Sequence, residues 1–141
     1  MESFDQKINR DIETILKTYK TVAVVGLSES PLKASHGVAA YLNSMGYRII
    51  PVNPNHKRIM GLPSYAKLED IPETVDVVDI FRPADQVLPI VEAAVRIGSK
   101  AVWLQTGIVN ERAAEYALQA GLRVVMDRCM KVEHMRQAFK R

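Results

Sequence analysis

The sequence predicts a doubly wound α/β domain, in which a parallel sheet of five strands carries helices on both faces. Two observations lead to this prediction. Short apolar runs without polar alternation recur along the chain, as expected for strands that are covered on both faces. Three of these runs follow a glycine that ends a helical pattern, and glycine closes helices well because it readily adopts the left-handed conformation. Strands and helices therefore alternate along the chain, which is typical of a doubly wound sheet.

The strands are predicted at residues 21–25 and 75–80 and at the apolar runs that follow Gly46, Gly98 and Gly121. We expect right-handed crossovers and the strand order 3-2-1-4-5. This order places the loops that follow Val25 and Leu104 at the point where the strand order reverses. Residues 54–74 interrupt the alternation, because they contain turn residues and at most one helical turn.

The helices are predicted from apolar residues at helical spacing, over residues 36–45, 83–97 and 111–120. Pro83 suits the first position of the second helix, and Asn110 suits the N-cap of the third. Two further helices are expected at the ends of the chain, the first from Ile8, Ile12, Ile15, Leu16 and Tyr19, and the second from Val132, Met135 and Phe139.

Composition limits the functional classes. The 141 residues suit a single domain, spanning 1–141, and no apolar run is long enough to cross a membrane. The single cysteine, Cys129, excludes an internal disulfide framework, so we expect a cytoplasmic protein. The net charge is +3 and no basic stripe alternates with aromatic residues, which argues against nucleic-acid binding and is consistent with a small phosphorylated ligand.

The loop after the first strand, residues 26–37, is the main candidate for a phosphate site. It supplies hydroxyl groups, Lys33 and two glycines immediately before a helix N-terminus, where free N–H groups attract anions. The alternative is a polar crossover loop without a ligand. The second strand ends in Val52 and Asn53 without the carboxylate that binds the ribose of NAD, so NAD is disfavoured while NADP remains open.

Six segments together resemble the small stand-alone CoA-binding-domain proteins, a family similar to the nucleotide-binding domain of the succinyl-CoA synthetase alpha subunit. They are VVGLS (24–28), KASHGVA (33–39), VNPN (52–55), DIFR (79–82), AVWLQTG (101–107) and MDRCMK (126–131). The resemblance extends over nearly the whole chain. It implies a Rossmann-like fold that binds coenzyme A.

The resemblance also implies which residues contact the ligand. The CoA phosphates would be faced by Gly26, Leu27 and Ser28, and Lys33 and Ser35 would close over them. The adenosine would be bordered by Asn53 and Pro54. The pantetheine or adenine would be bordered by Phe81, Arg82 and Pro83. The synthetase carries its phosphohistidine in a second domain, for which this sequence has no counterpart.

We therefore expect non-catalytic binding of coenzyme A or acyl-CoA, with no metal, no nucleic acid and no membrane. A protein partner or a homo-oligomer remains open. The alternatives are an NADP-binding reductase and an interaction domain that has lost its ligand. Trp103 is either part of the pocket floor or part of the core. Cys129 is either an inert buried residue or a thiol close to the ligand.

Overall fold

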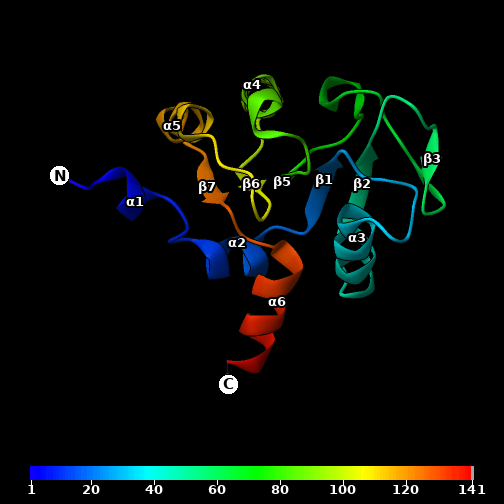
Figure 1. Ribbon diagram of the computed structural model, residues 1–141, viewed down its shortest axis with the longest axis horizontal. Coiled ribbons are helices and arrows are strands. Elements are labelled where there is room, and N and C mark those ends of the chain that lie inside the picture. Colours follow the sequence, from blue (N-terminus) through cyan, green and yellow to red (C-terminus); the bar gives the residue numbers. More distant parts are fainter. Residues whose placement is uncertain (141) are drawn as a thin grey trace.

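The structure is a computed structural model that describes residues 1–140. A parallel sheet of five strands lies at its centre (Figure 1). The strands are β1 (Thr21–Val25), β2 (Arg48–Val52), β5 (Val77–Ile80), β6 (Ala101–Leu104) and β7 (Arg123–Met126), and their order across the sheet is β2-β1-β5-β6-β7. Their residues are almost all buried, which explains why the sequence shows apolar runs rather than alternation.

The strand order is of the predicted 3-2-1-4-5 type when Tyr65 is counted as the third strand. Tyr65 forms an isolated parallel bridge with Val52 on the free edge of β2. Consequently β5, the third predicted strand in chain order, does not lie beside β2 but pairs with β1, with Val25 opposite Ile80. The strand order therefore reverses between β1 and β5. The expectation that the loop after Leu104 lies at this point is wrong, and the loop after Ile80 takes its place.

The segment between β2 and β5 explains this difference, because it forms only short elements. They are a two-residue antiparallel pair, β3 (Arg58–Ile59) with β4 (Leu62–Pro63), and a helical turn, η1 (Leu68–Asp70). As predicted, no long helix forms here. The third strand is thereby reduced to the single bridge at Tyr65.

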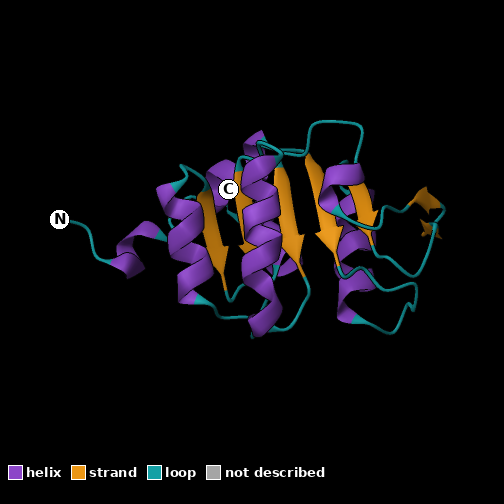
Figure 2. Ribbon diagram, turned by 90° about the horizontal axis from the view of Figure 1, so that it is seen from above, coloured by secondary structure: helices purple, strands orange, loops and turns teal. Residues whose placement is uncertain are grey.

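Helices cover both faces of the sheet, as predicted (Figures 1 and 2). On one face lie α4 (Val87–Arg96) and α5 (Glu111–Gln119), and on the other α2 (Ile12–Thr18), α3 (Ala34–Ser44) and α6 (Met130–Phe139). Trp103 is fully buried on the second face and its indole Nε1 donates to the Arg128 carbonyl at 2.9 Å, so it belongs to the core.

The helix ends test several predictions. The Asn110 side chain accepts a hydrogen bond from the Ala113 N–H, which confirms it as the N-cap of α5. Pro83 instead precedes a short turn, η2 (Ala84–Gln86), which leads into α4, so it is not the first residue of that helix.

The two terminal helices differ from their predictions. The N-terminal helix is interrupted between α1 (Phe4–Lys7) and α2, because Asn9 has φ +58° and bonds to Val124 and Met126 of β7. The predicted C-terminal helix exists as α6. However, its buried residues are Met130 and Glu133, whereas the three that predicted it (Val132, Met135 and Phe139) are exposed.

None of the helices in the described part of the chain is long and apolar enough to cross a membrane.

Candidate functional site

Two cavities lie at the carboxyl ends of the strands, and Arg82 lines both. The first, of about 400 Å³, is enclosed by the loops that follow β1, β2 and β5; we call it the loop cavity. The second, of about 450 Å³, lies between the start of α3 and the loops that follow β5 and β6; we call it the apolar cavity. Both volumes lie within the usual range for small-molecule sites, and both cavities lie beside the reversal of strand order, where open α/β sheets bind ligands.

Hydrogen bonds within the loop after β1 fix its shape. The Ser28 N–H donates to Ser35 Oγ at 3.0 Å, and the Ser30 N–H donates to Ser28 Oγ at 3.1 Å. Asn53 Nδ2 donates to the Leu27 carbonyl at 3.0 Å, which joins this loop to the end of β2. These bonds connect the loop to the first turn of α3 and to the end of β2.

Gly26 lies where the loops after β1 and β5 touch. Its φ is +86°, and a Cβ at this position would lie 2.5 Å from the Phe81 carbonyl oxygen. Packing against the neighbouring loop thus already requires glycine here, whether or not a phosphate lies beside it. A side chain at Gly26 would disturb the loops themselves.

Seven of the ten predicted site residues line these cavities. Gly26, Ser28, Asn53 and Pro54 line the loop cavity, Phe81 and Pro83 line the apolar cavity, and Arg82 lines both.

The other three predicted residues line neither cavity. The Leu27 side chain is fully buried in the core, so only its backbone is available near the loop cavity. Ser35 is also buried, and its hydroxyl holds the backbone of Ser28. Lys33 is exposed immediately before α3.

Charged side chains around the loop cavity include a pair that the sequence analysis did not identify. His56 Nδ1 lies 3.4 Å from a Glu29 carboxylate oxygen, and both residues line the cavity. The guanidinium of Arg82 donates from Nη2 to Gln86 Oε1 at 2.6 Å. Glu29 and His56 could have been found from their positions, since they follow β1 and β2 closely in sequence.

The apolar cavity has a polar pair at its base. Gln105 lines the cavity although it is only 4% exposed, and its Nε2 donates to Oδ1 of Asp79. Asp79 is fully buried, and burial raises the pKa of its carboxyl to about 7, although the Gln105 hydrogen bond acts in the opposite direction. Cys129 also lines this cavity, at the residue before α6.

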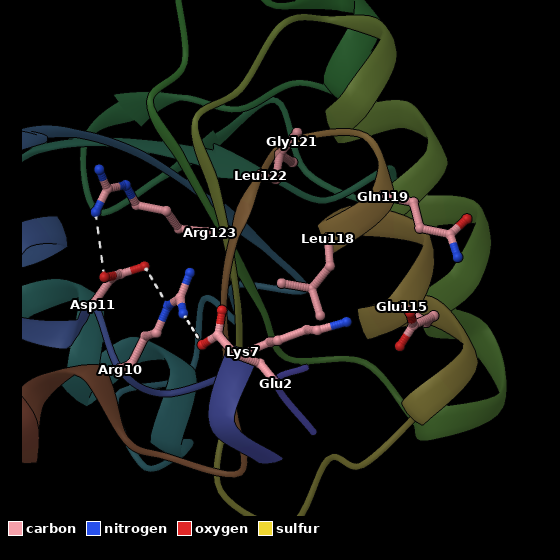
Figure 3. A pocket seen from close by; sticks show the side chains of 10 residues that line it. All are labelled: Glu2, Lys7, Arg10, Asp11, Glu115, Leu118, Gln119, Gly121, Leu122 and Arg123. Atoms are coloured by element: carbon pink, nitrogen blue, oxygen red, sulfur yellow. Dashed lines mark hydrogen bonds and ion pairs between the residues drawn. The ribbon is translucent and has the colours of Figure 1, made fainter. Parts of the chain in front are cut away.

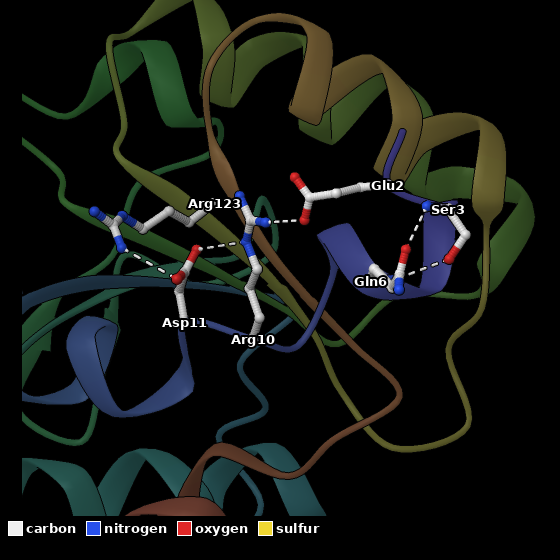
Figure 4. A network of polar contacts seen from close by, with 6 residues as sticks. All are labelled: Glu2, Ser3, Gln6, Arg10, Asp11 and Arg123. Carbon is white, nitrogen blue, oxygen red and sulfur yellow. Dashed lines mark hydrogen bonds and ion pairs between the residues drawn. The ribbon is translucent and has the colours of Figure 1, made fainter.

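A wider cleft, of about 600 Å³, lies elsewhere, between the N-terminal segment and α5 (Figure 3). Ion pairs cross it: Arg10 pairs with Glu2 and Asp11, and Arg123 pairs with Asp11 at 3.5 Å (Figure 4). Arg123 begins β7, so this cleft is at the opposite end of the strand from the two cavities. Two of its three cations, Arg10 and Arg123, already have acidic partners, and none of the predicted site residues lines it.

Residues 1–140 contain no group of three histidine, cysteine or acidic side chains that could hold a metal ion.

Comparisons with known proteins agree with this fold. A solved structure of a hypothetical protein from Pyrococcus horikoshii OT3 superposes with a TM-score of 0.89 and 38% identity over 96% of both chains. The uncharacterized protein YneT of Bacillus subtilis is 37% identical over 88% of this chain and 92% of its own length.

Longer proteins contain a similar segment. The ADP-forming acetate–CoA ligase II of Archaeoglobus fulgidus is 35% identical over 69% of this chain, which corresponds to 15% of the ligase. The family model described as the CoA binding domain matches residues 20–135, which include both cavities' strands and loops. This protein therefore belongs to the CoA-binding-domain family and has its Rossmann-like fold.

Proposed function

We propose that this protein binds coenzyme A or acyl-CoA across the two cavities and does not itself catalyse a reaction. The observation that carries the proposal is that a cavity bordered by several polar and charged side chains lies beside a mainly apolar one, and that Arg82 lines both. Coenzyme A has the same two parts, a phosphorylated adenosine and a long pantetheine arm that ends in a thiol. One ligand molecule would place a different part in each cavity, within the single domain of residues 1–141.

The loop cavity would hold the nucleotide and its phosphates. Ser28 supplies a hydroxyl group on one side, next to Gly26, and Asn53 and Pro54 border the other side. The first turn of α3, whose Ala34 lines the apolar cavity, has no side-chain cap, so its dipole and the N–H groups that precede His36 would be available to a phosphate lying between the two cavities. Lys33, immediately before that turn, would add positive charge at the exposed side.

The apolar cavity would hold the pantetheine arm. Phe81 and Pro83 supply apolar surface, and Val38 of α3 lies opposite. Gln105 offers a carboxamide to the amide groups of the arm, which lose their water when they enter the cavity. Arg82 is the cation shared by the two parts of the site.

The position of Asn53 disfavours NAD. A dinucleotide fold that binds NAD uses a carboxylate at the end of the second strand for the ribose hydroxyls. Here the Asn53 amide instead donates to the Leu27 carbonyl, and its oxygen accepts from the Asn55 N–H at 2.8 Å. Both ends of this side chain are occupied, so it offers little to a ribose diol.

The proposal of a binder without catalysis rests on the share of the ligase that this chain matches. This chain corresponds to 15% of the Archaeoglobus ligase, and we assign that protein's catalytic steps to its remaining parts. We also propose a cytoplasmic location, because a reducing compartment keeps a free thiol such as Cys129 reduced.

Thermal denaturation with CoA, acetyl-CoA, NAD and NADP in parallel tests the proposal. A ligand at 100 times its dissociation constant stabilises the fold by about 2.7 kcal/mol, which for a domain of this size raises Tm by roughly 8–13 °C. We expect this shift with CoA and acetyl-CoA and none with NAD. A shift with NADP alone would support the reductase alternative, and no shift with any ligand would support an interaction domain.

A further inference from the structure

Asp79 is an acid in a place where an apolar residue is expected. It lies on β5, in register with Val24 of β1 and Trp103 of β6, and it is fully buried. An isolated buried carboxyl group is costly unless hydrogen bonds compensate for the lost water. Asp79 obtains only partial compensation: Oδ1 accepts from Gln105, while Oδ2 has no hydrogen-bond partner among the described residues. A buried group of this kind calls for an explanation other than fold stability.

The hydrogen bond from Gln105 acts on the side chain and is not needed to place the backbone. The Gln105 N–H already donates to the Ile80 carbonyl at 3.3 Å, and the Gln105 carbonyl accepts from the Ile108 N–H at 2.9 Å. The bond to Asp79 adds a fixed direction to the carboxamide, which otherwise rotates about three single bonds. It leaves Oε1 and the second Nε2 hydrogen of Gln105 for other partners.

We propose that Asp79 is a positioning residue, which holds the carboxamide of Gln105 at the base of the apolar cavity so that it can bind an amide of the pantetheine arm. The inference rests on the proposed function, because it requires that the arm enters this cavity. Asp79 acts through Gln105 and does not touch the ligand. It contributes by removing in advance the rotational freedom that ligand binding would otherwise have to remove.

The test compares two ligands on the full-length protein by titration calorimetry. CoA occupies both cavities, whereas adenosine 3′,5′-bisphosphate lacks the arm and occupies only the loop cavity. Asp79→Leu removes the acceptor while keeping four side-chain heavy atoms branched at Cγ, and it is expected to weaken CoA binding about three- to tenfold, the usual cost of immobilising one flexible side chain. Its affinity for adenosine 3′,5′-bisphosphate should equal that of the parent. This second affinity also shows that the variant is folded.

Two further variants separate positioning from structural damage. Asp79→Asn keeps an acceptor oxygen for Gln105 Nε2, so it should bind CoA as the parent does. In a Gln105→Ala background, Asp79→Leu should cause no additional loss, because the side chain through which it acts is absent.

The possible failures are distinguishable. If the parent does not bind CoA, the proposed function is wrong and the inference falls with it. If the parent binds CoA and Asp79→Leu binds it equally well, only the inference is wrong. The same holds if Asp79→Leu weakens both ligands by one factor, or if its loss persists in the Gln105→Ala background.

Discussion

Replacing Asp79 by asparagine should change how the stability of the protein depends on pH. In the folded protein, burial raises the pKa of this carboxyl from 3.8 to about 7. Between these two pH values the unfolded chain releases the proton while the folded protein keeps it. Unfolding therefore becomes easier as pH rises, by about 1.4 kcal/mol per pH unit, until the folded carboxyl also ionises near pH 7. The asparagine side chain of the variant has no such proton to release.

The free energy of unfolding of both proteins can be measured by urea denaturation at pH 5, 6, 7 and 8. Relative to the parent, Asp79→Asn should gain about 2 to 3 kcal/mol between pH 5 and pH 7, and little more above pH 7. Other titrating groups are common to both proteins and cancel in the difference. A difference that stays constant from pH 5 to pH 8 would refute the reasoning, since it would mean that the folded carboxyl has an ordinary pKa.

Three further substitutions test the ligand site, and a fourth tests the loop that forms it. Arg82→Ala should weaken CoA binding about 10- to 150-fold in calorimetric titrations, because charge-assisted hydrogen bonds contribute roughly 1.5–3 kcal/mol. Lys33→Ala should have a smaller effect that shrinks with added salt, while the control Lys131→Ala changes affinity little; equal losses in the two lysine variants would contradict the site. Glu29→Gln should tighten CoA binding about two- to fivefold at low salt, since it removes a negative charge beside the phosphates, and weaker binding would exclude phosphates from the loop cavity. Gly26→Val should lower Tm by several degrees even without ligand, because its Cβ would lie 2.5 Å from a backbone oxygen; an unchanged Tm would show that the loops can move apart.

The sequence was sufficient for the strands and most helices because their patterns are local. Each buried strand appears as an apolar run. The start of α5 is indicated by its N-cap, Asn110, whose side chain bonds to the N–H of Ala113, three residues further on. Strand order depends on pairing between distant segments, and here one parallel bridge at Tyr65 decides how the strands are counted. The apolar spacing correctly predicts a helix at α6, but Val132 and Met135, on which that prediction rests, are exposed. Spacing alone therefore does not identify the buried side of this helix.

The candidate site was predictable only in part for a similar reason. A loop sequence indicates which residues follow a strand, but it does not indicate which of them point inward. Leu27 belongs to the core and Ser28 to the cavity, although they are neighbours. Asp79 and Gln105 are 26 residues apart in the sequence, and no local pattern connects them.

A crystal structure of the protein with CoA would test the central claim most directly. The account predicts electron density for the phosphates beside Gly26 and Ser28 in the loop cavity, and for the arm past Arg82 towards Gln105 in the apolar cavity. CoA bound elsewhere, for example in the charged cleft beside Arg123, with both cavities empty, would contradict it.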